Sequence, residues 1–145
     1  MAEAYQSKQN EKKFELLTYL ELTCSKLEEC FEDLTNNRYD EKIKANINKE
    51  LSDFYNLMFK DKKLSNKITN SGKYISMLIG KELGAKDPKE RLNKGFAYLW
   101  ENLDYLSKNP DYSKLKGKNS EQLKNFFSHL SDRFESHSKK ILKSL

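Results

Sequence analysis

Valine does not occur anywhere in this chain, and its absence restricts the fold more than any other feature of the sequence. The other β-branched residues are also few, with six Ile and four Thr, whereas Leu occurs 20 times. Strands draw on β-branched residues, and leucine favours helices. The 145 residues match the length of one domain, at roughly 150 residues per domain. We therefore predict a single all-α domain over residues 1–145, with residues 1–10 frayed.

The composition also indicates that the chain folds. Hydrophobic residues make up only 37% and charged residues 34%, but eight Phe, eight Tyr and one Trp accompany a net charge of only +5. Disordered chains usually have few aromatic residues and a large net charge. The longest uncharged and mostly apolar run, 74–80, is far shorter than the roughly 20 residues that cross a bilayer. We therefore expect a soluble, folded protein.

The two cysteines indicate the compartment. Cys24 and Cys30 lie on one predicted helix, about 9 Å apart along its axis, which is too far for a disulfide within that helix. Unpaired cysteines are typical of a reducing environment. Residues 1–10 contain no apolar core of a secretory signal. We expect a cytoplasmic protein, with a processed secreted form as the alternative.

Apolar residues recur with helical spacing in five segments, which predict an up-and-down bundle of four to five mainly antiparallel helices. The first segment, 11–34, carries two interleaved heptad rows. These rows consist of Leu17, Cys24 and Phe31, and of Leu20, Leu27 and Leu34. Leu16, Tyr19 and Cys30 widen this stripe. A self-complementary seam of this kind would support a homodimer if it is not fully buried in the monomer.

The next two helices are predicted over 40–60 and within 64–83. Asp40 is a suitable N-cap for the first of them, and Gly72 is expected to break the second into two pieces. Gly84 follows the second of these helices directly. A residue in the left-handed conformation, usually glycine, commonly ends a helix at this position.

The last two helices have the clearest boundary signals. Asp87 followed by Pro88 is typical of an N-cap and the first helical position, and the pair 109–110, Asn-Pro, predicts where this helix ends. The last helix is expected to be capped by Asn119 or Ser120.

Residues that carry chemistry are few. The two histidines, His129 and His137, are about 12 Å apart along one predicted helix, so they cannot share a metal ion. The sequence contains no zinc, calcium or nucleotide-binding spacing and no nucleophile turn. We therefore expect neither an enzyme nor a protein with a cofactor.

One face of the fourth predicted helix combines aromatic and basic residues. Tyr98 and Tyr105 are one heptad apart and project about 130° away from its leucine stripe. The polar residues around them are Arg91, Lys94, Asn102 and Lys108. Tyrosines among cations suit a surface that binds a protein partner or stacks on unpaired bases. In the alternative interpretation, these rings belong to a second core face of the helix.

Charge is unevenly distributed along the chain. Residues 1–36 hold four basic and eight acidic groups, net −4, and residues 37–145 hold 23 basic and 14 acidic groups, net +9. Two lysine clusters fall in predicted loops; they are Lys60, Lys62 and Lys63, and Lys114, Lys116 and Lys118. The basic part either neutralises the acidic helix within the fold or provides a face for an acidic partner.

Together these patterns favour a non-enzymatic interaction or regulatory protein that binds a protein partner through exposed helix faces. The face with Tyr98 and Tyr105 is the candidate surface. Two alternatives remain open. One is a small basic helical subunit that binds RNA or DNA through lysines and stacked tyrosines. The other is a carrier that holds a small ligand in an aromatic-lined pocket inside the bundle.

Overall fold

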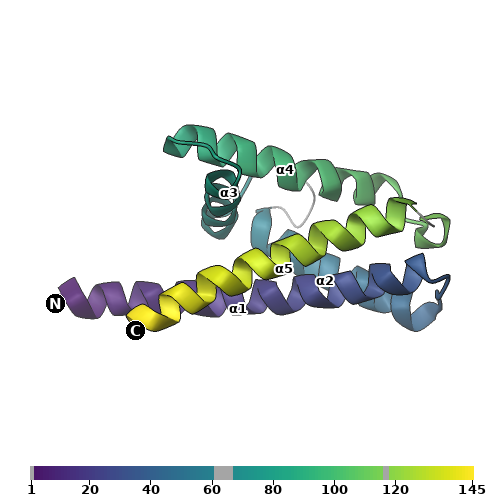
Figure 1. Cartoon of the computed structure of the whole chain (residues 1–145), viewed down its shortest axis with the longest axis horizontal. Helices are drawn as coiled ribbons and strands as arrows, with labels where there is room; N and C mark the ends of the chain where they lie inside the picture. Colours follow the sequence, from purple (N-terminus) through teal and green to yellow (C-terminus); the bar gives the residue numbers. More distant parts are fainter. Residues whose placement is uncertain (1, 61–66, 116–117) are drawn as a thin grey trace. The chain divides into compact units, whose positions relative to one another are not determined.

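The computed structural model describes residues 2–60, 67–115 and 118–145. These residues form five α-helices and one short 3-10 helix, with an isolated antiparallel bridge between Phe59 and Ile68 but no strand (Figure 1). The prediction of an all-α helical bundle is thus confirmed. Within the described ranges, no helix has a stretch that is both long and apolar enough to cross a membrane.

The chain divides into two compact units. Unit 1 consists of Met1–Glu50 and Lys116–Leu145, and unit 2 consists of Leu51–Leu115. The helix α2 (Glu41–Met58) begins in unit 1 and ends in unit 2. That the two units unfold as one domain stays a prediction.

Unit 1 is built on the packing of α1 (Ala2–Thr35) against α5 (Lys118–Ser144). The hydroxyl oxygens of Thr35 and Ser120 are 2.9 Å apart. Further along the pair, the hydroxyl of Ser131 donates a hydrogen bond to the carbonyl oxygen of Glu21 at 3.3 Å. Because the contacting residue numbers fall in one helix as they rise in the other, the two helices are antiparallel.

The heptad rows of α1 form the core of unit 1. All six of their residues are at most 2% exposed. The ring of Phe31 stacks on that of Phe127 in α5, with centroids 5.6 Å apart and an interplanar angle of 7°. The seam is therefore fully buried within the chain, and the condition for a homodimer through these residues is not met.

Unit 2 contains α3 (Asn70–Glu82), α4 (Pro88–Lys108) and the 3-10 helix η1 (Tyr112–Lys114). Two glycines let α3 and α4 approach until their backbones touch. A Cβ atom on Gly95 would lie 1.6 Å from the carbonyl oxygen of Ser76, and one on Gly80 would lie 1.8 Å from that of Arg91. This antiparallel crossing has no room for a side chain at either position.

Two of the predicted N-caps are confirmed. The Asp40 carboxylate accepts a hydrogen bond from the backbone of Ile43 at 2.8 Å, and the Asp87 carboxylate accepts one from the backbone of Glu90 at 2.8 Å. Pro88 is the first residue of α4, as predicted. Each cap depends only on residues three positions apart, so local sequence is sufficient to specify it.

Other boundary predictions are wrong. Gly72 does not break α3; it lies inside the helix, where a Cβ atom would come within 2.5 Å of the carbonyl oxygen of Met58. Neither Asn119 nor Ser120 caps α5, because this helix already begins at Lys118. The hydroxyl of Ser120 lies beside that of Thr35 instead. The first helix starts at Ala2, nine residues ahead of the predicted start at residue 11, and the fraying of residues 1–10 stays a prediction.

Candidate functional site

The predicted surface on α4 is only partly open. Tyr98 and Tyr105 are half-buried, and burial, followed by the charge of Glu101, raises the pKa of Tyr98. The side-chain amide of Asn102 donates a hydrogen bond to the carbonyl oxygen of Tyr98 at 3.3 Å. Asn102 therefore uses its amide on the helix itself. Partner binding at this surface stays a prediction.

The basic residues of this surface have partners within unit 2. The Lys94 amine lies 3.1 Å from the Glu90 carboxylate, and the Lys108 amine lies 3.0 Å from that of Asp104. Both are pairs four residues apart on one helix. The guanidinium of Arg91 is half-buried and donates a hydrogen bond to the Ala85 carbonyl oxygen at 3.1 Å. These contacts reduce the positive charge that α4 offers to an acidic partner or to phosphates.

The two lysine clusters are only partly described. Lys60 and Lys114 are exposed and both belong to unit 2. Lys62, Lys63 and Lys116 lie outside the described residues, and Lys118 is the first residue of α5. A basic face formed by these loops therefore stays a prediction.

The aromatic residues of unit 2 pack against one another. The ring of Phe59 lies 6.4 Å from that of Phe96 and 6.1 Å from that of Trp100, both edge-on, and Phe96 stacks on Trp100 at 5.6 Å. Edge-on and offset arrangements at such distances are the favourable ones for aromatic pairs. These rings supply packing to unit 2, and an aromatic-lined ligand pocket stays a prediction.

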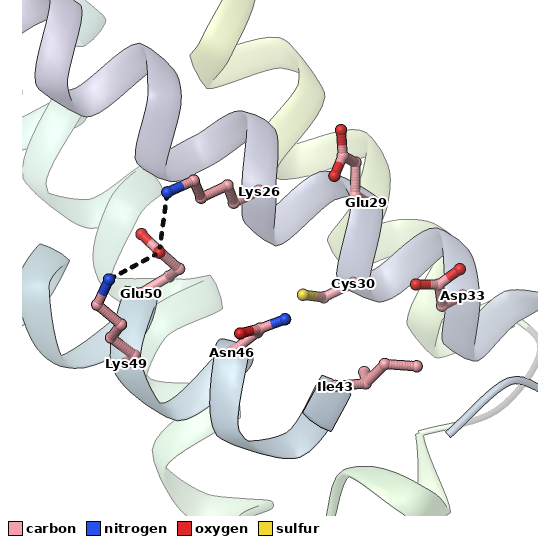
Figure 2. A pocket seen from close by; sticks show the side chains of 8 residues that line it. All are labelled: Lys26, Glu29, Cys30, Asp33, Ile43, Asn46, Lys49 and Glu50. Carbon is pink, nitrogen blue, oxygen red and sulfur yellow. Dashed lines mark ion pairs between the residues drawn. The ribbon is translucent and has the colours of Figure 1, made fainter. Parts of the chain in front are cut away.

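Unit 1 has a pocket of about 300 Å³ between α1 and the first half of α2 (Figure 2). Four of its lining residues come from α1, namely Lys26, Glu29, Cys30 and Asp33, and four from α2, namely Ile43, Asn46, Lys49 and Glu50. The volume is at the lower end of the range for ligand pockets, roughly 300–1,000 Å³. No aromatic residue is among the eight, so this is not the pocket that the sequence suggested.

One end of the pocket is formed by a buried carboxylate between two lysines. The side chain of Glu50 is only 7% exposed, and the amines of Lys26 and Lys49 lie 3.7 and 4.0 Å from its carboxylate. Figure 2 shows both amines directed at Glu50. Both distances are longer than a hydrogen bond, and among the described residues none donates to this carboxylate. The lysines therefore offset its charge, while its oxygens keep capacity to accept hydrogen bonds.

The other end of the pocket carries negative charge without a partner. Glu29 and Asp33 lie four residues apart on α1, on either side of Cys30 along the chain. Within the described ranges, neither carboxylate has an ion pair. Like charges at this spacing on a helix destabilise it by a few tenths of a kcal/mol. A cation at this position would remove that repulsion.

The thiol between these carboxylates is held in its protonated form. Figure 2 shows the Cys30 sulfur directed into the pocket, although the residue is only 5% exposed. Burial, followed by the charges of Asp33, Glu29 and Glu50, raises the pKa of Cys30 to about 11. Burial and the charge of Glu50 also raise the pKa of Cys24. Since the thiolate is the nucleophile, this environment does not suit thiol catalysis.

We expect Cys30 in the folded protein to react with iodoacetamide about 100-fold more slowly than an ordinary thiol near neutral pH. This factor follows from the rise in its pKa from 9.0 to about 11, and burial slows the reaction further. Peptide mass mapping after timed alkylation measures the rate, and the same protein in urea serves as the control. The rate should rise with pH until about pH 11. A folded-state rate equal to the rate in urea would contradict the account of this thiol.

A second row of residues runs along α1 from this pocket. Tyr19, Leu22, Lys26, Glu29 and Asp33 are spaced alternately by three and four residues, so they lie on one line, which we call the outer row. This line is roughly 150° around the helix from the buried heptad rows and about 21 Å long. Its first two members are large, apolar and exposed.

The exposure of the outer row corrects one sequence interpretation. Tyr19 was expected to widen the buried stripe of the first helix, but it is 45% exposed, and Leu22 is 57% exposed. Neither the outer row nor the pocket was predicted from the sequence. The heptad spacing of the outer row could have indicated it. Three of its five residues are charged, however, so a search for apolar periodicity does not find them.

No group of three or more His, Cys, Asp or Glu side chains among the described residues is arranged to hold a metal ion. Comparisons with known proteins also returned no relatives: no family model matches the chain, and neither curated proteins nor solved structures gave a match.

Proposed function

We propose that this chain is a non-enzymatic interaction or regulatory protein that binds a partner protein through the outer row of α1. The observation that carries this proposal is the exposure of Tyr19 and Leu22, 45% and 57%, next to each other on one helix face. Large apolar side chains exposed beside charged ones are typical of protein interaction sites. Burying a leucine side chain contributes about 1.5–3 kcal/mol, and tyrosine is enriched among the residues that dominate binding energies.

The helix beneath this face is packed against the rest of unit 1. The opposite side of α1 is packed against α5, and Leu20 and Leu27 in its buried rows are fully covered. A partner that binds the outer row therefore meets side chains on a helix that is already in place. Preorganisation of this kind reduces the entropic cost of association.

The charges favour a protein over a nucleic acid as the partner. Along the outer row, Glu29 and Asp33 outnumber the single cation, Lys26, which is also paired with Glu50. Nucleic acids bind where lysines and arginines neutralise phosphates. The tyrosine surface of α4 is the second candidate for a protein partner, but its rings are half-buried and its lysines are paired.

Replacing Tyr19→Ser and Leu22→Ser together should reduce recovery of the partner at least about tenfold, because a loss of about 1.4 kcal/mol already corresponds to that factor. Quantitative affinity capture from the source cells, followed by mass spectrometry, measures the recovery. The thermal midpoint should change little, since exposed side chains usually contribute less than about 0.5 kcal/mol to stability.

The matched variant for this experiment is Tyr98→Ala with Tyr105→Ala, which changes the α4 surface and should leave recovery unchanged. If only the α4 variant loses the partner, binding occurs at the tyrosine surface and not at the outer row. If neither variant changes recovery of any protein, the proposed function is wrong.

A further inference from the structure

We propose that the pocket between α1 and α2 receives a basic side chain, arginine or lysine, from the partner segment that covers Tyr19 and Leu22. This inference rests on the proposed function and names the chemistry of the partner. The segment it describes is amphipathic, with an apolar part over one end of the outer row and a cation over the other.

The negative charge of the pocket favours a positively charged ligand. Its lining holds three carboxylates and two lysines, net −1, and residues 1–36 are net −4. The two lysines are directed at Glu50 (Figure 2), which leaves the end with Glu29 and Asp33 without an ion pair among the described residues. A cationic group placed near this end is attracted by both carboxylates and offsets the repulsion between them.

The interior of the pocket suits a group with several hydrogen-bond donors. Cys30, 5% exposed, directs its sulfur into the space, and Asn46 presents a side-chain amide from α2 (Figure 2). The oxygens of Glu50 have acceptor capacity left, because its lysines are 3.7 and 4.0 Å away. A guanidinium has five donors in a planar fork that matches carboxylates, so arginine fits this lining better than lysine.

The distances along α1 between Leu22 and the two carboxylates predict how apolar and basic residues are spaced in the partner. Glu29 lies seven residues beyond Leu22, about 10.5 Å along the helix, and Asp33 lies eleven residues beyond it, about 16.5 Å. A helix lying along the outer row would therefore place its basic residue two to three turns from the apolar residue that contacts Leu22. This pattern distinguishes the expected partner from a purely apolar helix.

The pocket is tested without the partner by titrating the isotopically labelled protein with N-acetyl-arginine methylamide. The matched neutral probe is the citrulline compound, which has the same shape but no charge. We expect the arginine probe to shift the backbone amide signals of Glu29, Cys30, Asp33 and Asn46, and the citrulline probe to leave them in place. Equal shifts with both probes, or no shift with either, would overturn the inference.

Two variants separate a specific site from general attraction to an acidic protein. Glu29→Gln with Asp33→Asn should weaken binding of the arginine probe at least about tenfold, the equivalent of about 1.4 kcal/mol. Glu11→Gln with Glu121→Gln removes the same charge from exposed positions outside the pocket and should not weaken it. Equal weakening by both variants would mean that the cation is held only by net charge, which contradicts a site.

Failure of this inference is distinguishable from failure of the proposed function. The serine variant of Tyr19 and Leu22 should bind the arginine probe as the wild type does, because these residues do not line the pocket. A partner captured equally well by the wild type and by the variant of Glu29 and Asp33 would overturn the pocket inference alone. Recovery that is unchanged in the serine variant would overturn the proposed function, whatever the arginine probe does.

Discussion

Gly95→Ala should destabilise unit 2 by about 4 kcal/mol or more, which is an exceptional loss for the addition of one methyl group. The new Cβ atom would lie 1.6 Å from the Ser76 carbonyl oxygen and 2.8 Å from the backbone nitrogen of Gly80. Both neighbours are backbone atoms of α3, so no side chain can turn away to make room. The helices must separate, and the apolar contacts on both sides of their crossing are then lost.

The fluorescence of Trp100, the single tryptophan, reports this change because its ring packs on Phe96 and Phe59 within unit 2. Chemical unfolding monitored by the fluorescence of this ring gives the free energy of unfolding of unit 2. Asn93→Ala is the control: it adds an alanine to an exposed position of the same helix, where higher helix propensity should slightly increase stability. A loss of less than about 1 kcal/mol for Gly95→Ala would contradict the close crossing of α3 and α4.

Phe31→Ala should destabilise unit 1 by about 3–5 kcal/mol, the usual cost of removing a large aromatic ring from a core. Phe31 is fully buried and stacks on Phe127 at 5.6 Å, so the substitution leaves a cavity between α1 and α5. Hydrogen exchange of the α1 and α5 amides measures the loss. Ser25→Ala, at a half-buried position of the same helix, is the control and should have a small effect.

The same variant tests the prediction of a single domain. Phe31 belongs to unit 1, and Trp100 belongs to unit 2. If the chain unfolds as one domain, the transition reported by Trp100 should shift together with the exchange of the α1 amides. An unchanged Trp100 transition would instead mean that the two units unfold independently. If the amide hydrogens of α1 exchange in Phe31→Ala as slowly as in the wild type, the stack of Phe31 on Phe127 does not belong to the core.

The features predicted correctly from the sequence depend on neighbours along the chain. The caps at Asp40 and Asp87 use backbone groups three residues away, and Pro88 is pre-set for the first turn of a helix. The heptad rows of α1 are likewise a local pattern, because any helix with this spacing places them on one side. Burial of these rows therefore followed from the sequence, although the identity of their partner helix, α5, did not.

The features that the sequence did not predict depend on segments far apart in the chain. Glycine has a low helix propensity, but the backbone of Met58 lies so close to Gly72 that a side chain would not fit at this position. Tyr19 has the spacing of a residue beside the core, but it is 45% exposed in the folded chain. The pocket exists only because α2 places Lys49 and Glu50 opposite α1, and no periodicity in either helix encodes that arrangement.

Photocrosslinking from Leu22 shows whether the outer row of α1 binds a partner through a basic segment. A photoreactive phenylalanine at this position should form an adduct with one protein, at a segment that carries an arginine or lysine two to three turns from the crosslinked residue. The same group at Ser136, which is exposed on α5, should not form this adduct. Adducts with a second copy of this chain, with nucleic acid, or equally from both positions would contradict the account.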